Sequence, residues 1–167
     1  MITVIGPGME TDALTALVAD QPDNRCDLLL VNALSDSAAN DFDQLDDQLF
    51  DKRCIEDVVD CFSDISGILP SLRTGSRIVF LVPSDFLGGT GCAYQATSAA
   101  MLVGLARSLA LELADQMITV NCLAPSKDGK LDGMRESIAF LLTDKAADVS
   151  GQVILIDGGT NLSLRKS

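Results

Sequence analysis

Apolar residues occur along the chain in two patterns: short continuous runs, and longer segments in which they recur every three or four residues. The continuous runs lie at residues 2–5, 27–32, 78–82, 118–123 and 152–156. Short runs of aliphatic and β-branched residues are typical of strands that are covered on both faces. The pattern therefore predicts about five buried strands.

Helices are predicted between these runs, because the intervening segments place apolar residues on one helical face. The predicted helices are residues 10–20, 48–70, 93–114 and 134–144. Strands that alternate with helices form a parallel sheet through right-handed crossovers, which put helices on both faces. Residues 1–167 contain no internal repeat and no second set of elements, so we expect a single α/β domain.

The composition excludes two classes of partner. The chain is 47% apolar, and 24 acidic residues against 12 basic ones give it a net charge of −12. Such a chain lacks the basic face that nucleic acids and anionic membranes require. No apolar run reaches the roughly 18 residues of a membrane span, and the first strand leads directly into Gly6 and Pro7. We therefore expect a cytoplasmic protein without a membrane partner.

Two residue types are missing altogether. Without histidine and tryptophan the chain has no histidine-based catalysis, no His-containing metal site and few stacking platforms. The cysteines are odd in number and form no C-x-x-C pair; they are Cys26, Cys54, Cys61, Cys92 and Cys122. This favours buried thiols in a reducing compartment over disulfides or zinc, and we expect no bound metal.

An acidic stretch between residues 41 and 64 allows two interpretations. Its carboxylates are Asp41, Asp43, Asp46, Asp47, Asp51, Glu56, Asp57, Asp60 and Asp64. They are suitable oxygen ligands for a cation. They are also typical of a solvated face or of the charged rim of a partner interface, which is the interpretation that we favour.

Three motifs occur in a characteristic order. Residues 27–33 are DLLLVNA, residues 107–125 contain RSLALELA followed by ITVNCLAP, and residues 151–159 are GQVILIDGG. In this order and spacing they resemble the short-chain dehydrogenase/reductase family, with its D-x-L-V-N-N-A-G strand, its R-S-L-A-x-E-L and I-x-V-N-x-I-x-P-G block and its closing G-x-x-x-x-V-D-G-G strand. The resemblance extends from residue 27 to residue 159.

The resemblance implies a shortened version of the family's fold. The family's sheet has the strand order 3-2-1-4-5-6-7, and this chain has no counterpart of strands two and three. Its first strand leads through one helix to the strand that matches the fourth. We therefore expect a Rossmann-like parallel sheet of about five strands in the order 1-4-5-6-7, with helices on both faces.

The positions on which the family's catalysis depends are altered. Tyr94 matches the family's catalytic tyrosine, but Ser98 replaces the lysine four residues later and supplies no charge beside the phenol. Pro83 occupies the position of the catalytic serine, with Ser84 beside it, and residues 55–57 hold no asparagine where the family has one. We expect no catalytic residue, and we favour Tyr94 as an ordinary helix tyrosine over a vestigial acid/base.

The cofactor site that the resemblance implies is also depleted. The family's T-G-x-x-x-G-x-G loop brings the pyrophosphate to a helix N-terminus. Here Gly6, Pro7 and Gly8 are followed by Met9 and Glu10, which places a carboxylate where phosphate binds in the family. The glycine pair fits either a phosphate loop or a strand-ending turn, and we favour the turn. We expect no cofactor on this chain.

The segments through which family members assemble are retained, namely residues 48–70, 93–114 and 134–156. The first hypothesis is a non-catalytic subunit that assembles with a full-length, active family member, either through residues 48–70 and 93–114 or through the 134–156 region. The heteromer would be an NAD(P)-dependent alcohol or 3-hydroxyacyl dehydrogenase, with NAD(P) in the partner subunit. The net charge of −12 favours a less acidic partner over self-association.

Two alternatives stay open. One is a homo-oligomeric ligand-binding or regulatory module that uses a cleft near Asn32, Ser84 and Tyr94, at the carboxyl ends of the strands. The other is a weak NAD(P)-dependent reductase with Tyr94 as the proton donor.

Overall fold

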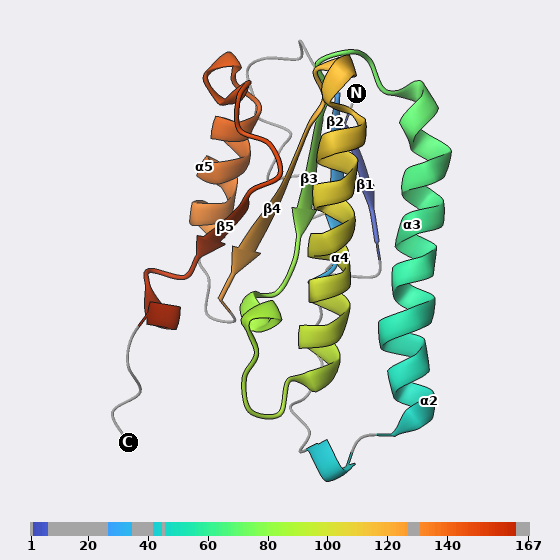
Figure 1. Ribbon diagram of the computed structural model, residues 1–167. Coiled ribbons are helices and arrows are strands. Elements are labelled where there is room, and N and C mark those ends of the chain that lie inside the picture. Colours follow the sequence, from blue (N-terminus) through green and yellow to red (C-terminus); the bar gives the residue numbers. More distant parts are fainter. Residues whose placement is uncertain (1, 7–26, 35–41, 45, 127–130, 163–167) are drawn as a thin grey trace.

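A computed structural model describes residues 2–6, 27–34, 42–44, 46–126 and 131–162 (Figure 1). These residues contain a five-stranded sheet in the order β1-β2-β3-β4-β5, and every neighbouring pair is parallel. The strands are β1 (Ile2–Ile5), β2 (Leu28–Asn32), β3 (Arg77–Leu81), β4 (Thr119–Pro125) and β5 (Val153–Ile156). The predicted fold class and the order of the strands are confirmed.

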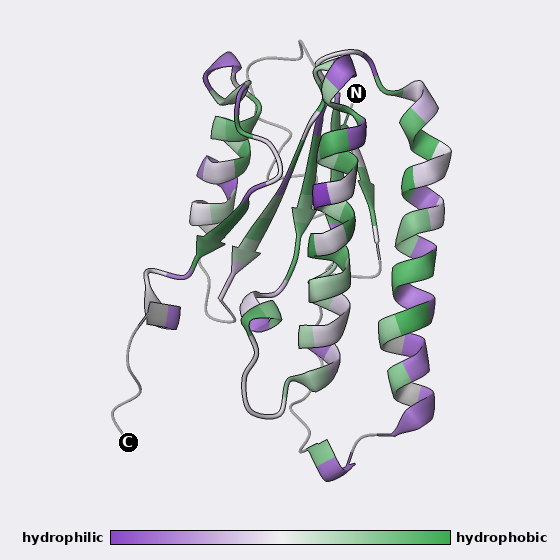
Figure 2. Cartoon of the chain, viewed as in Figure 1, coloured by the Kyte–Doolittle hydropathy of each residue, from purple (hydrophilic) through white to green (hydrophobic). Residues whose placement is uncertain are grey.

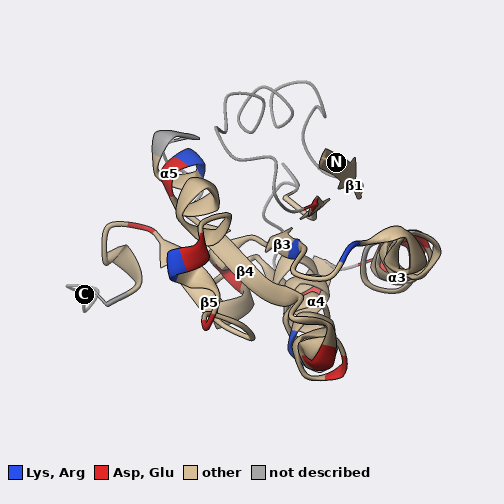
Figure 3. Cartoon of the chain, turned by 90° about the horizontal axis from the view of Figure 1, so that it is seen from above, with Lys and Arg blue, Asp and Glu red and all other residues tan. Residues whose placement is uncertain are grey.

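Helices cover both faces of this sheet. They are α2 (Asp47–Phe50), α3 (Asp57–Ile68), α4 (Ala93–Glu112) and α5 (Leu131–Leu141), with the π-helix η2 (Asp51–Glu56) between α2 and α3. Seen from above, α3 and α4 lie on one side of the sheet and α5 on the other (Figure 3). The 3-10 turns are η1 (Phe42–Gln44), η3 (Leu69–Ser71), η4 (Ser84–Leu87), η5 (Ala114–Gln116), η6 (Asp144–Ala146) and η7 (Thr160–Leu162).

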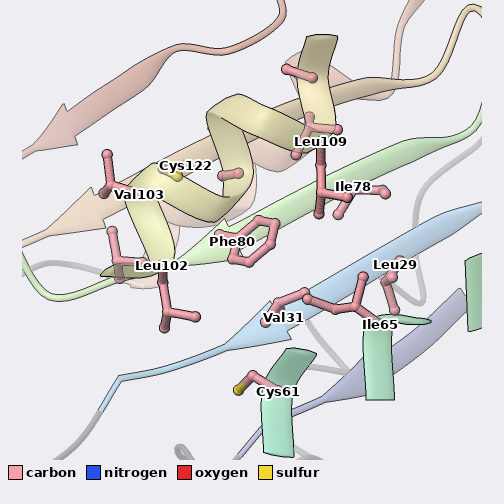
Figure 4. Close-up of a cluster of buried hydrophobic side chains, with 14 of the residues drawn as sticks. Leu29, Val31, Cys61, Ile65, Ile78, Phe80, Leu102, Val103, Leu109 and Cys122 are labelled. Carbon is pink, nitrogen blue, oxygen red and sulfur yellow. The ribbon is translucent and has the colours of Figure 1, made fainter. Parts of the chain in front are cut away.

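The sheet divides the core in two, because successive side chains of a strand point to opposite faces. Leu29 of β2 packs with Ile65 of α3 and the inner face of α4 in the larger cluster (Figure 4). Its neighbours Leu28 and Leu30 pack with Ile138 of α5 in the smaller one. Strands β2, β3 and β4 are buried along their whole length, which explains their continuous apolar sequences.

The hydropathy of the elements follows this layering. Apolar residues dominate the strands, whereas α3 alternates between apolar and polar positions along its length (Figure 2). None of the helices that the structure describes is long and apolar enough to cross a membrane.

The predicted helix 48–70 is not a single regular α-helix, because η2 interrupts it. Consecutive residues of a helix point about 100° apart, so apolar residues at neighbouring positions cannot all face the core. Cys54 is fully buried, while the next residue, Ile55, is 46% exposed, and Val59 and Phe62 are exposed as well. The prediction that all of these residues share one buried face is therefore wrong.

The helix predicted at residues 134–144 begins earlier, at Leu131, and ends at Leu141. Gly133, which was expected in the preceding loop, lies inside α5. A Cβ atom at Gly133 would stand 3.0 Å from Cγ2 of Ile156, so glycine lets the helix pack closely on β5.

The strands at the two edges are less buried than predicted. β1 and β5 are half-buried, and Ile2 is 38% exposed, because each has a neighbouring strand on one side only. The predicted helix 10–20 lies outside the described residues.

Candidate functional site

The carboxyl ends of parallel strands form the edge at which ligands bind in open α/β sheets. In this chain a hollow of about 640 Å³ lies at that edge, between the segment after β3 and the segment after β5. It is lined by Ser84, Asp85, Leu87, Gly88, Gly89, Thr90, Asp157, Thr160 and Asn161.

Asp157 organises one wall of this hollow. Its carboxylate accepts hydrogen bonds from the backbone N–H of Asn161 at 3.0 Å and from that of Gly159 at 2.9 Å. These amides favour the charged form and lower the pKa of the carboxyl below its ordinary value. Asp157 and Asp85 are both acidic, and the described lining contains no lysine or arginine, so this hollow does not suit the pyrophosphate of a dinucleotide.

Tyr94 lies near the start of α4 and is buried, with 4% of its surface exposed. Its hydroxyl accepts a hydrogen bond from the backbone N–H of Asp46 at 2.7 Å and donates one to the backbone oxygen of Asp46 at 2.9 Å. Asp46 is also the N-cap of α2, because its carboxylate accepts from the N–H of Gln48. The phenol is thus engaged with the beginning of the acidic helix.

The surroundings of Tyr94 are apolar or neutral. The ring lies against Phe50 with centroids 5.8 Å apart. The hydroxyl of Ser98 donates to the backbone oxygen of Tyr94 at 3.0 Å, and the Cys54 thiol donates to the same oxygen at 3.6 Å. Ser98 therefore bonds back onto its own helix and takes no part in activating the phenol.

The structure brings together only part of the predicted cleft. Ser84 begins η4 and lines the hollow, and Pro83 is the residue before it. Asn32 and Tyr94 are not among the described lining residues. Asn32 is buried at the end of β2, where its side-chain oxygen accepts from the N–H of Leu34 at 3.2 Å.

Gly6 ends β1 with a φ of +107°, a conformation that favours glycine. A Cβ atom there would clash with the backbone oxygen of Asn32. Gly6 thus permits the ends of β1 and β2 to approach closely. Gly8 and Glu10, which belong to the segment for which we favour a turn over a phosphate loop, lie outside the described part of the chain.

Neither the acidic stretch nor the thiols form a metal site in the described residues, where no three potential ligands gather. Cys54, Cys61, Cys92 and Cys122 are buried, and no disulfide joins any two of them. Burial raises the pKa of Cys54, that of Cys61 to about 11 and that of Cys122 to about 12, so their thiolates are disfavoured near neutral pH.

Two contributions to this region were not visible in the sequence. Asp46 holds Tyr94 through its backbone, and backbone groups leave no mark in a residue pattern. Asp157 was interpreted only as the end of a strand, although its place in the D-G-G motif marks the loop that lines the hollow.

This arrangement defines a class of protein: a Rossmann-like α/β domain of the kind found in oxidoreductases. No family model matches the chain. A (2S)-[(R)-hydroxy(phenyl)methyl]succinyl-CoA dehydrogenase subunit of Thauera aromatica is 30% identical over 127 residues, covering 61% of this chain and 51% of that protein. A 3-oxoacyl-[acyl-carrier-protein] reductase of Aggregatibacter actinomycetemcomitans is 32% identical over 111 residues, covering 52% and 46% respectively.

Solved structures agree on the fold. An acetoin dehydrogenase from Enterobacter cloacae superposes with a TM-score of 0.72 at 20% identity, over 93% of this chain and 71% of that one. An acetoin dehydrogenase from Salmonella typhimurium superposes with a TM-score of 0.71 at 21% identity, over 96% of this chain and 75% of that one. At these identities the likeness concerns the fold alone.

The homologues of this chain are short-chain dehydrogenases/reductases, and its fold is the fold of that family. The family resemblance predicted from the motifs is confirmed. The chain spans about half the length of the curated relatives it matches.

Proposed function

We propose that this chain is a non-catalytic subunit that assembles with a full-length, active short-chain dehydrogenase/reductase and supports it. The complex would be an NAD(P)-dependent alcohol or 3-hydroxyacyl dehydrogenase in the cytoplasm, with NAD(P) in the partner subunit. The observation that carries the proposal is the engagement of the Tyr94 hydroxyl by both backbone groups of Asp46.

Proton transfer by a tyrosine needs a hydroxyl that can reach the substrate and a neighbouring charge that stabilises the phenolate. The hydroxyl of Tyr94 is instead buried and bonded to the Asp46 backbone, and Ser98 supplies no charge beside it. The only cation of α4 is Arg107, which is 13 residues further along the helix. At a rise of 1.5 Å per residue, that is about 20 Å away.

The surface of α3 and α4 supports the assembly part of the proposal. Ile55, Val59 and Phe62 are between 46% and 56% exposed, and Leu111 on α4 is 81% exposed. Exposed apolar side chains at three- and four-residue spacing, as in Ile55, Val59 and Phe62, suit contact with a partner helix. The Thauera relative is itself described as a subunit of a dehydrogenase.

Native mass spectrometry tests the assembly. The chain is co-expressed with a full-length family member encoded in the same genome, one that has the Tyr-x-x-x-Lys pair. We expect a stable hetero-oligomer, and we expect Phe62→Asp to abolish it, whereas Met117→Asp, at an apolar residue that is 67% exposed outside the assembly segments, has no effect. Two chains that never associate under these conditions would refute the proposal.

Activity assays test the non-catalytic part. The isolated chain is expected to show no oxidation of NADH or NADPH with 3-oxoacyl or ketone substrates. In the complex, Tyr94→Phe is expected to leave kcat within about twofold of the wild type, since the phenol serves no proton transfer. Turnover by the isolated chain that disappears in Tyr94→Phe would establish the weak reductase instead.

The hollow beside Ser84 favours a second candidate, a ligand-binding or regulatory module. Its lining of hydroxyl, amide and carboxylate groups suits an uncharged or cationic polar ligand. A thermal-shift screen of polyols and polyamines on the isolated chain checks this. A stabilising compound whose effect is lost in Ser84→Val, and kept in Ser137→Ala, would support the module.

A further inference from the structure

We propose that the exposed apolar stripe of η2 and α3 binds a partner helix that carries lysine or arginine beside its apolar residues. We further propose that the carboxylates along this stripe prevent it from pairing with a second copy of the chain. This inference rests on the proposed function and adds the chemistry of the partner.

The stripe consists of Ile55, Val59 and Phe62, which are 46%, 53% and 56% exposed. Their separations of four and three residues place them on one side of the helix. The sheet-facing side of the same helix is formed by Cys61 and Ile65, which are buried. The stripe is therefore distinct from the core face, and the fold of this chain does not need it.

A row of carboxylates runs beside the stripe. Glu56, Asp60 and Asp64 are exposed and recur every four residues, so they follow the helix in parallel with the apolar residues. Between residues 47 and 68 the sequence has six carboxylates and two cations. Acidic residues of α3 are coloured red in Figure 3.

The row of carboxylates would repel a second copy of this chain and attract a basic partner. In a two-fold symmetric pair the same surface lies on both sides of the contact, so acidic residues would meet acidic residues. Each chain also has a net charge of −12. A partner helix with basic residues at its rim converts the same contacts into attraction and excludes the homodimer.

The range of these forces identifies the residues to change. Screening at physiological salt limits electrostatic interactions between exposed charges to about 8 Å, so only carboxylates next to the stripe act across the contact. The test variant is therefore Asp60→Lys. Its control is Asp115→Lys, which changes the net charge equally at an exposed position of η5, outside the assembly segments.

Two measurements on the full chain follow. Sedimentation velocity of the isolated chain is expected to show a monomer for the wild type and the control, and concentration-dependent self-association for the test variant. Titration against the full-length family member is expected to show about a tenfold weaker complex for the test variant at low salt. The difference between variant and control is expected to shrink as salt is added.

The outcomes separate the two proposals. If the wild type forms no complex with any full-length family member, the proposed function fails. If the complex forms but test variant and control bind equally, the charge-selective surface is refuted while the subunit role stands. A wild-type chain that is already a dimer through α3, broken by Phe62→Asp, would also refute the inference.

Discussion

At the residue scale, Tyr94 has a hydrogen-bonding role that its sequence position does not suggest. Its hydroxyl fixes both backbone groups of Asp46 at the point where α2 begins. The backbone N–H at the start of a helix has no partner within the helix, whereas the Asp46 oxygen also accepts from the N–H of Phe50 at 2.9 Å. A buried phenol that pairs with them therefore contributes to the position of the acidic helix rather than to chemistry.

Tyr94→Phe is expected to lower the free energy of unfolding by about 1–2 kcal/mol, because it removes two hydrogen bonds and keeps the ring. Urea titration followed by circular dichroism measures the change. Ser98→Ala, which removes a hydroxyl bonded only to its own helix, is the control and should change stability by less than about 0.5 kcal/mol. Equal effects of the two substitutions would show that the Tyr94 hydroxyl makes no special contribution.

Replacing each of two glycines by alanine should change the stability of the protein in opposite directions. Gly6→Ala is expected to cost more than about 2 kcal/mol, because φ is +107° and the new Cβ would clash with the Asn32 backbone oxygen. Gly67→Ala is expected to stabilise by about 0.5–1 kcal/mol, since that glycine lies in α3 with open space around it. The midpoints of thermal unfolding of the two variants, compared with that of the wild type, test both expectations.

At the element scale, ion pairs and hydrogen bonds join segments that are distant in sequence. Asp27, just before β2, accepts two hydrogen bonds from the Arg73 guanidinium, at 3.0 and 2.9 Å, and one from the Arg73 backbone N–H. Arg77, at the start of β3, donates from Nε to the backbone oxygen of Leu141, the last residue of α5. These contacts fix the positions of the amino-terminal ends of β2 and β3.

The Asp27 contact has a pH signature. The Arg73 guanidinium holds the pKa of Asp27 below its ordinary value of 3.8, so the unfolded chain binds the proton more tightly than the native one. The stabilisation is complete above about pH 5 and is lost as the pH falls below about 4. The stability difference between wild type and Asp27→Asn should shrink over that range in urea titrations; a difference that is constant from pH 7 to pH 3 would contradict this.

At the scale of the whole molecule, the net charge of −12 opposes the compact state through self-repulsion. Nine of the carboxylates lie between residues 41 and 64. Packing of α3 against the sheet is therefore opposed by the electrostatic repulsion among these carboxylates. The apolar contacts of Cys61 and Ile65 with the larger core cluster offset it.

Sodium chloride is expected to raise the thermal midpoint by a few degrees between about 0.02 and 0.3 M, as it screens this repulsion. Asp60→Asn combined with Asp64→Asn should raise the midpoint at low salt and reduce the response to salt. Choline chloride at the same ionic strength controls for effects specific to sodium. A midpoint that falls with salt would show that attractive pairs outweigh the repulsion.

The sequence by itself determined the fold class, the five strands and the resemblance to short-chain dehydrogenases/reductases, because each rests on local patterns. A strand covered on both faces must be apolar throughout, and the motifs that carry the resemblance have structural functions that local sequence records. Asn121 is an example: its side chain bonds the backbone of Val149 and Gln152 and so joins β4 to the segment before β5.

Only the tertiary structure decided what the retained residues contact. The apolar residues of 48–70 occupy two neighbouring sides of the helix, and packing on the sheet buries Cys54 while it leaves Ile55 and Phe62 exposed. The sequence identified Tyr94 as a tyrosine without its lysine, whereas the fold brings it to the backbone of Asp46, 48 residues earlier. Contacts over such separations depend on how helices pack on the sheet, and no local pattern encodes them.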